Sequence, residues 1–249
     1  MDIKEEIKNY QLIIMALIVS LGIFFSCLTV ANAIIKYQKI NNQTISVTGS
    51  ALKEVKSDFG VFTIYYEVRD NNLKEAYEKI LTDQEKIKDF VISKGFLIED
   101  LTLNPINNYT LFTRTKEGFE TNQVEGYRLT SSIKVSSKTI NKITELSKSS
   151  TELIKENVEI SSSNVEYFVT DLDNLKIEIL KDASKNAKQR ALSIVSSTGG
   201  KIGNLKSAKM GVFQIVPKNS TEVSDYGIND TSSIDKKVIA VVNATFFTK

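Results

Sequence analysis

The sequence contains no histidine, no tryptophan, two prolines and a single cysteine, Cys27. Without histidine, a catalytic triad with an imidazole base is excluded, as are most zinc sites and the usual proton-transfer group at neutral pH. Cys27 lies in an apolar stretch, so the 213 residues after Lys36 have neither a disulfide nor a thiol nucleophile. That region must be stable through its hydrophobic core, and it is long enough to build one.

The sequence also has almost no excess of one charge over the other. The formal net charge is +2, and residues 1–36 contribute zero, with three lysines against three acids. The remainder is therefore nearly neutral as a whole, which gives no electrostatic reason to expect nucleic acid.

The longest apolar run, Leu12–Ile35, carries no charged residue. About 20 such residues cross a bilayer as a helix. The run predicts a transmembrane signal anchor at 12–35, after a short tail at 1–11 and before a linker at 36–43. The membrane is thus one predicted partner, through residues 12–35.

Two other interpretations of this segment stay open. Ala31-Asn32-Ala33 has the pattern of a signal-peptide cleavage site, although the start of the chain is mixed in charge and the apolar run is long for a signal peptide. Cys27 follows Ser26 as in a bacterial lipoprotein signal, although Phe24 and Phe25 do not suit that signal.

Lysines flank the span equally, with Lys4 and Lys8 before it and Lys36 and Lys39 after it. The positive-inside rule therefore gives a tie. Because a short N-terminal tail before a single span usually stays in the cytoplasm, we expect residues 36–249 to lie outside it. The predicted location is the cell membrane, single-pass, with the C-terminal domain extracytoplasmic.

Strand and helix patterns alternate after the span, which predicts a single domain at 44–249. The fold class is α+β, a two-layer α/β sandwich with mostly antiparallel sheet, because neighbouring strands come in pairs with helices between them. The predicted strands are 44–52, 59–68, 97–103, 126–135, 158–169, 208–216 and 237–247, and the predicted helices begin at Asn71 or Asn72 and run to 94, then cover 139–149 and 172–198.

Polar residues mark the ends of these elements. Asp171 or Asp173 can cap the last helix, because a carboxylate accepts from free amide groups at a helix start. Gly95 and the pair Gly199-Gly200 suit the positions just past a helix. Asn104–Gln123 is either a flexible loop or a hairpin arm, and Pro217–Asp235 is predicted to be an exposed loop.

Three motifs follow one another along the chain. The first is Ile45-Ser46-Val47-Thr48-Gly49-Ser50-Ala51 with Val55 and Asp58, the second is Gly126-Tyr127-Arg128-Leu129-Thr130-Ser131, and the third is Asp182-Ala183, Asn186-Ala187, Arg190-Ala191 followed by Gly199-Gly200-Lys201-Ile202-Gly203. Over about residues 44–247 this pattern resembles the SIMPL domain (YggE-like) family.

The resemblance implies an envelope-located, mostly bacterial protein. Some relatives form ring-shaped or channel-like oligomers, and some are linked to resistance to oxidative and other envelope stress. The family brings no accepted enzymatic activity and no agreed catalytic residues. The long apolar start differs from the periplasmic relatives and is closer to the anchored ones.

Ala183, Ala187 and Ala191 recur every four residues and form one narrow helix stripe. The stripe is either a packing face within one chain or a contact between subunits. Asp182, Asn186 and Arg190 form a neighbouring row at the same spacing, interpreted as solvated or facing a subunit.

No candidate catalytic, cofactor-binding or metal-ligating residue emerges, and no cofactor is predicted. Gly199–Gly203 has the glycines of a phosphate loop, but it leaves a helix instead of entering one, so a helix cap followed by a turn explains it better. Glu99-Asp100 and the pair Asp171/Asp173 lack the alternating acids of a calcium loop. They are interpreted as turn and capping residues.

Two main classes of function remain. The first is a non-enzymatic, membrane-anchored envelope protein that forms a homo-oligomer and supports envelope integrity or stress tolerance. The alternative is a ligand-binding or carboxylate-based hydrolytic envelope domain, which requires a concave pocket lined by converging acids. A weaker third idea is a receptor that uses the loops Asn104–Gln123 and Pro217–Asp235, for a protein partner that the sequence does not identify.

Overall fold

The computed structural model describes residues 3–249, with side chains for 14–38 and 43–249. The first element, α1 (Ile3–Asn42), is one helix of 40 residues. Within it, Ile14–Gln38 has a mean hydropathy of 2.5 and is not buried by the rest of the chain. This helix is therefore long and apolar enough to cross a bilayer. It continues to Asn42, through most of the segment predicted as a linker.

The chain divides into two compact units. Unit 1 comprises Met1–Ala51, Leu180–Gly211 and Val241–Lys249, and unit 2 comprises Leu52–Ile179 and Val212–Ala240. Three elements, β1 (Thr44–Lys56), α4 (Leu172–Ser197) and β10 (Asp235–Thr248), contribute residues to both. The predicted domain boundaries stay predictions.

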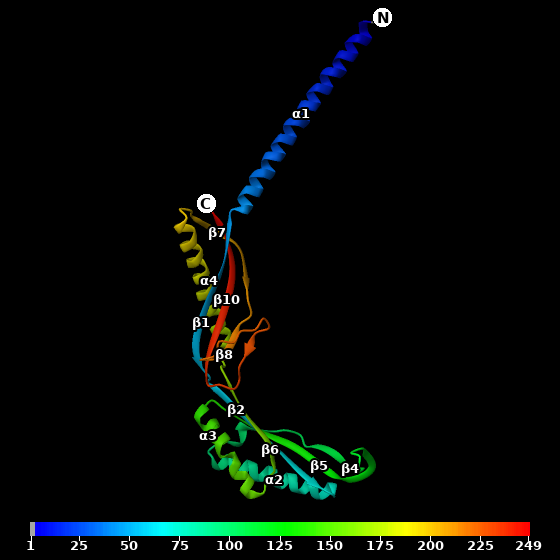
Figure 1. Cartoon of the computed structure of the whole chain (residues 1–249), viewed down its shortest axis with the longest axis vertical. Coiled ribbons are helices and arrows are strands. Elements are labelled where there is room, and N and C mark those ends of the chain that lie inside the picture. Colours follow the sequence, from blue (N-terminus) through cyan, green and yellow to red (C-terminus); the bar gives the residue numbers. More distant parts are fainter. Residues whose placement is uncertain (1–2) are drawn as a thin grey trace. The chain divides into compact units, whose positions relative to one another are not determined.

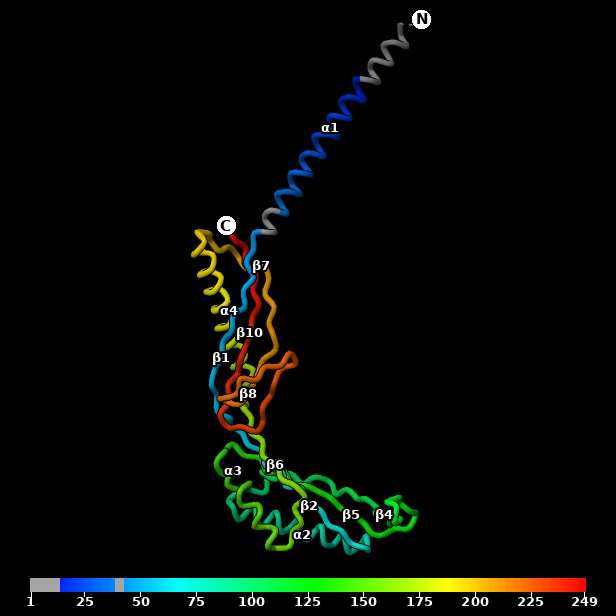
Figure 2. The backbone as a smooth tube through the Cα atoms, viewed as in Figure 1, coloured from blue at the N-terminus to red at the C-terminus, as the bar shows by residue number. Residues whose placement is uncertain are grey.

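Besides α1, unit 1 contains three neighbouring strands and most of the long helix α4 (Figures 1 and 2). β10 lies between β1 and the antiparallel β7 (Ile202–Met210). One face of β10 is buried and apolar; its buried residues in this unit are Val242, Ala244 and Phe246. The buried face of α4, which holds the three alanines of the stripe, supplies the other half of this small core. β7 is exposed along most of its length.

Unit 2 is built on an antiparallel sheet in the order β3-β5-β2-β6, with β4 also paired to β5. Its strands are β2 (Phe59–Asp70), β3 (Leu101–Leu103), β4 (Asn107–Arg114), β5 (Glu120–Ser137) and β6 (Ile160–Phe168). Helices α2 (Leu73–Ser93) and α3 (Ile140–Ser149) pack on one face of it (Figure 1). Residues of alternate positions, such as Phe62, Ile64 and Tyr66, point into the core between sheet and helices.

The remaining part of unit 2 holds β8 (Gln214–Pro217), which pairs antiparallel with β10, and β9 (Ile228–Asn229), which runs parallel to β8. The pairing of β7 with β10 and every pairing within the sheet of β2 to β6 are antiparallel. The predicted α+β class, with helices layered on mostly antiparallel sheet after an apolar N-terminal helix, is confirmed.

The caps follow the sequence closely. The Asn72 side chain accepts from the Lys74 amide at 2.9 Å, so Asn72 is the residue that begins α2. Gly95 and Gly199 have φ values of 87° and 77°, in the left-handed region that a helix end needs. Two bonds past α4, from the Gly199 amide to Ser196 O and from the Gly200 amide to Val195 O, complete the cap. Gly199-Gly200 is therefore a helix end and not a phosphate loop.

Two strand predictions are wrong in part. Leu97–Leu103 is a strand only from Leu101, because the Asp100 carboxylate accepts from the Leu97 amide at 2.9 Å and closes a 3-10 turn over Ile98–Asp100. The predicted strand at 208–216 is divided into β7 and β8. From Met210 to Gln214 the chain advances four residues while β10 advances three, from Val242 to Ile239, so one residue bulges out of the ladder.

The two long polar segments have more structure than a loop pattern suggests. Asn104–Gln123 is the hairpin arm, with β4 paired to β5 from Asn107 to Arg114. The segment Pro217–Asp235 is not uniformly exposed. It contains β9, and the Gln214 side-chain amide donates to Ser224 O at 2.6 Å, which holds Ser224 against β8.

Candidate functional site

The first and third sequence motifs meet in unit 1. A Cβ atom on Gly49 of β1 would lie 2.3 Å from Ala183 O and 2.4 Å from Ala187 N of α4. Only glycine allows the strand and helix backbones to come this close. Ala183, Ala187 and Ala191 are fully buried. The alanine stripe is therefore a packing face within one chain.

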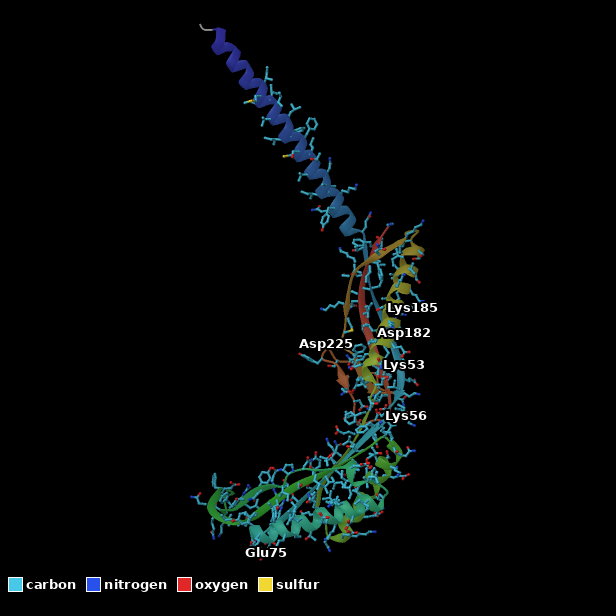
Figure 3. The ribbon with its side chains drawn as sticks, turned by 180° about the vertical axis from the view of Figure 1, so that it is seen from behind. Lys53, Lys56, Glu75, Asp182, Lys185 and Asp225 are labelled. Atoms are coloured by element: carbon cyan, nitrogen blue, oxygen red, sulfur yellow. The ribbon has the colours of Figure 1, made fainter. Side chains whose placement is uncertain are left out.

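The polar row beside the stripe bonds to the backbone of the same strand. The Ser50 amide donates to Asn186 Oδ1 at 3.2 Å, and Arg190 Nη1 donates to Thr48 O at 3.0 Å. β1 is a terminal strand of its sheet, so these bonds satisfy edge groups that no neighbouring strand pairs. Arg190 is exposed and Asn186 half-buried, so the row is solvated as predicted, and these two side chains in addition bond to β1. Figure 3 shows Asp182 on the same helix.

The carboxylates singled out in the sequence mostly serve local structure. Asp100 closes the 3-10 turn described above. Asp171 precedes α4, its carboxylate accepts from Asn174 Nδ2 at 2.7 Å, and its carbonyl accepts from the Leu175 amide. Asp100 is a turn residue, as predicted, whereas the Asp171 carboxylate bonds to a side-chain amide and its role as the cap of α4 stays a prediction.

A polar cluster in unit 2 was not predicted from the sequence. It consists of Asp230, Ser232, Ser233 and Lys236 and is called the Asp230 cluster below. Lys236 is 1% exposed, and its ammonium group donates to the Asp230 carboxylate at 3.0 Å and to Asp230 O. Burial would raise the pKa of Asp230, but hydrogen bonds from Ser233, Ser232 and Lys236 together lower it well below its usual range. Two serines and one lysine donate to the Asp230 carboxylate and fill its accepting positions. The Asp230 cluster therefore stabilises residues 230–236, and its carboxylate is not free to act as an acid or base.

Acids also line one open hollow of about 420 Å³ in unit 2, formed in part by Asp70, Glu120 and Glu125. Glu120 accepts from Arg114 at 3.1 Å, and Asp70 accepts from the Asn72 amide at 2.9 Å. Two of the three acids are thus engaged by neighbours. Among the described residues, no group of three or more acidic or cysteine side chains could hold a metal ion.

A second hollow of unit 2 has a different chemistry. It encloses about 510 Å³ on the sheet face opposite α2 and α3, and none of its lining residues is charged. Tyr65, which is 43% exposed, lies opposite Ser132 of β5 and Ser162 of β6. Asn104 Nδ2 donates to the Ser132 hydroxyl at 2.8 Å and fixes one wall. The lining consists of Tyr65, Asn104, Pro105, Asn107, Thr130, Ser131, Ser132, Ser161 and Ser162.

Sequence reasoning missed this hollow because Phe59–Val68 was interpreted as a strand without asking which face each residue takes. The adjacent pair Tyr65-Tyr66 carried the signal. Tyr66 is 1% exposed and points into the core, so its neighbour Tyr65 must point to the other face.

Unit 1 contains an apolar groove of about 340 Å³ between α4 and β7. Its floor is the apolar face of β10, with Val242, Ala244 and Phe246. Leu205 of β7 lines it and is 53% exposed, and Lys188 of α4 lies at its side. Nearby Met210 is 50% exposed. β7 therefore presents apolar side chains beside a strand edge.

Comparison with known proteins identifies the class of the chain. Residues 45–246 match the family SIMPL, described as "Protein of unknown function (DUF541)". The match covers most of the chain, which therefore belongs to the SIMPL family. The resemblance drawn from the three motifs is confirmed.

Other comparisons add little. No curated protein matches the sequence. A crystal structure described as a hydrolase from Listeria innocua is 10% identical, with a TM-score of 0.23, and the match covers 80% of this chain and 92% of that one. An uncharacterized conserved protein from Listeria innocua is 11% identical, with a TM-score of 0.24, over 77% and 92% of the two chains. At such TM-scores neither likeness informs the fold or chemistry of this chain.

Proposed function

We propose that this protein is a non-enzymatic, membrane-anchored SIMPL protein of the cell envelope that assembles into a homo-oligomer and supports envelope integrity or tolerance of oxidative and other envelope stress. The predicted single-pass location, with residues 36–249 outside the cytoplasm, is part of this proposal. Support comes from the family, from the apolar helix at Ile14–Gln38, and from the use of the signature residues for packing.

The observation that carries self-assembly is the difference between the two strand edges of unit 1. β1 has Asn186 and Arg190 bonded to its backbone. β7 has nine residues, is exposed, and carries Leu205 and Met210 beside the apolar groove. A long exposed edge with apolar side chains is a template for pairing with another chain. We assign the β7 edge and its groove to a second copy of this chain.

The test is the oligomeric state of the full-length chain in detergent, measured by crosslinking and by mass photometry. Leu205→Lys should weaken self-association about tenfold, because it places a charge in the contact, equivalent to about 1.4 kcal/mol. Val223→Lys is the matched control, since Val223 is 74% exposed in unit 2. A monomeric wild-type chain, or equal association of both variants, would contradict the assignment.

A second candidate, a ligand-binding domain, is favoured by the uncharged hollow of unit 2 around Tyr65, called the Tyr65 hollow below. An aromatic ring surrounded by uncharged hydroxyl and amide groups suits a neutral, polyhydroxylated ligand such as a glycan strand. No corresponding observation favours the carboxylate-based hydrolytic alternative, because two of the three acids in the acidic hollow are engaged by neighbours.

Titration with an oligosaccharide of N-acetylglucosamine, followed by NMR chemical shifts of the full-length chain, tests this candidate. Tyr65→Ala should remove the binding, because it removes the only aromatic ring in the lining. Tyr77→Ala, at a residue of α2 that is 49% exposed, should leave it unchanged. Absence of shifts with the wild type, or equal binding by both variants, would remove the Tyr65 hollow as a glycan site.

A further inference from the structure

The nearly neutral sequence divides into units of opposite charge. After residue 43, unit 1 has eight basic side chains and one acid, Asp182, a formal charge of +7. Unit 2 has 20 basic and 26 acidic side chains, a formal charge of −6. The basic residues of unit 1 are Lys181, Lys185, Lys188, Arg190, Lys201, Lys206, Lys209 and Lys249. The positive unit is the one that continues directly from α1.

Two of these lysines are paired across strands. The Lys201 amide donates to Lys249 O and the Lys249 amide donates to Lys201 O, both at 2.8 Å. Residues that exchange both bonds in an antiparallel pair lie directly opposite, about 5.5 Å apart at Cα, with side chains on the same face. Both lysines are exposed. Two like charges in this arrangement repel each other, so a bound anion would stabilise them.

This pair lies close to the point where the chain leaves the apolar segment. The adjacent Thr248 amide donates to Gln43 O at 2.9 Å. Gln43 is five residues beyond Gln38, the last residue of the candidate span. Five residues reach about 17 Å when fully extended and about 8 Å as a helix. The pair is therefore within one or two Debye lengths of a bilayer surface at physiological salt.

By sequence, Lys36 and Lys39 also lie beside the end of the apolar run Leu12–Ile35. The acid of unit 1 is remote, because Asp182 lies fifteen residues before Ser197 on α4, about 22 Å along the helix axis. The α-carboxylate of Lys249 offsets one positive charge in a chain that ends there. The charge of Lys201 and Lys249 together is still positive, next to the point where the chain leaves the apolar segment.

We infer that Lys201 and Lys249 bind the head groups of anionic phospholipids at the surface of the membrane that α1 crosses. This inference rests on the proposed membrane anchor. Each lysine near an anionic surface strengthens such binding about fivefold. The contact holds unit 1 against the bilayer and opposes free rotation of the unit about the end of the helix.

The lysines of α4 provide an internal control. Lys181 and Lys185, the second of which Figure 3 shows on α4, are twelve or more residues before Ser197 and so about 18 Å or more along the helix from its end. A lipid surface at the α1 side should not reach them. A second copy of the chain or a soluble polyanion would have no reason to prefer Lys201 and Lys249 over them.

The experiment reconstitutes the full-length chain into nanodiscs of phosphatidylcholine, alone or mixed with phosphatidylglycerol, and measures acetylation of each lysine by mass spectrometry. Lys201 and Lys249 should react about fivefold more slowly in the anionic discs. High salt should abolish the difference, and Lys181 and Lys185 should react alike in both discs. Equal rates for Lys201 and Lys249 in the two discs would overturn the inference, as would equal protection of the α4 lysines.

Paired variants give a second readout. Lys201→Gln with Lys249→Gln should reduce the number of phosphatidylglycerol molecules retained in native mass spectra, whereas Lys181→Gln with Lys185→Gln should not. Equal retention by the two variants contradicts the inference. A chain that does not enter nanodiscs at all would instead defeat the proposed membrane anchor, so the two failures are distinguishable.

Discussion

Gly49 lets the first and third sequence motifs pack together, because it allows β1 to contact the alanine stripe of α4 directly. Gly49→Ala should lower the free energy of unfolding by about 3 kcal/mol, since the added methyl would overlap Ala183 O and Ala187 N and the backbones must separate. Chemical unfolding of the full-length chain in detergent measures this. Gly211→Ala is the matched control in the same unit, because its Cβ would meet no atom closer than 3.5 Å. Equal stabilities of the two variants would show that the contact is not close.

The Asp230 cluster should make unit 2 sensitive to acid. The pKa of Asp230 is lowered in the folded chain, so its contribution to stability is complete above the unfolded value near 3.8 and is lost as the pH falls toward the lower folded value. Asp230→Asn should lower the free energy of unfolding at pH 7 by about 3 kcal/mol, because the buried Lys236 loses its counter-charge.

The same variant should also flatten the loss of stability below about pH 4. Some slope remains from Asp58, whose pKa the hydrogen bond from the Thr170 hydroxyl lowers. Lys236→Met, which removes the buried charge itself, should cost less than Asp230→Asn. Unfolding curves between pH 7 and acidic pH compare the three chains. A wild-type and an Asp230→Asn profile with the same slope would refute the role given to this carboxylate.

At the scale of elements, the hairpin of β4 and β5 is an arm whose end is held mainly by its own turn. The Thr115 amide donates to Phe119 O and the Gly118 amide donates to Thr115 O. Limited trypsin digestion should therefore cut first after Lys116, which is exposed in this turn. Lys116→Gln should slow the first cut several-fold. A first cut within α2, found by mass spectrometry, would show that the arm is better protected than the core helix.

The same elements show how far the sequence predicts the fold. Local signals narrowed the cap of α2 to Asn71 or Asn72 and were sufficient for the glycines after α2 and α4 and for most of β2 and β5, because propensity and capping are decided within a few residues. The bulge after Met210 was not predictable in this way. It arises because β10 pairs with β7 and then with β8, a long-range register that no local pattern contains.

The candidate sites depend on such long-range register even more. Tyr65, Ser132 and Ser162 form one wall only because three strands place them side by side. The hydrogen bonds from Lys236 and two serines to Asp230 likewise form only once Pro217–Asp235 is folded, and the sequence of this segment predicts an exposed loop. The alanine stripe was found by spacing alone, but its partner Gly49 lies in another motif and only the structure joins them.

At the scale of the whole molecule, the orientation of the apolar helix in the membrane stays a prediction. We predict that a cysteine in unit 2 is accessible from outside intact cells. Cys27 is the only cysteine of the chain and lies within the apolar segment, so Cys27→Ser removes the background. In that chain Tyr226→Cys, at a residue 97% exposed, should react with a membrane-impermeant maleimide without permeabilisation.

Glu5→Cys in the same background is the matched control, because residue 5 precedes the apolar run by sequence. It should react only after the membrane is opened. The reverse pattern would place the domain in the cytoplasm, and the anionic lipids that face unit 1 would then be those of the inner leaflet. Reaction of both cysteines in culture medium after removal of the cells would indicate a released protein. Because a helix as apolar as Ile14–Gln38 is costly to expose to water, we expect that fraction to be small.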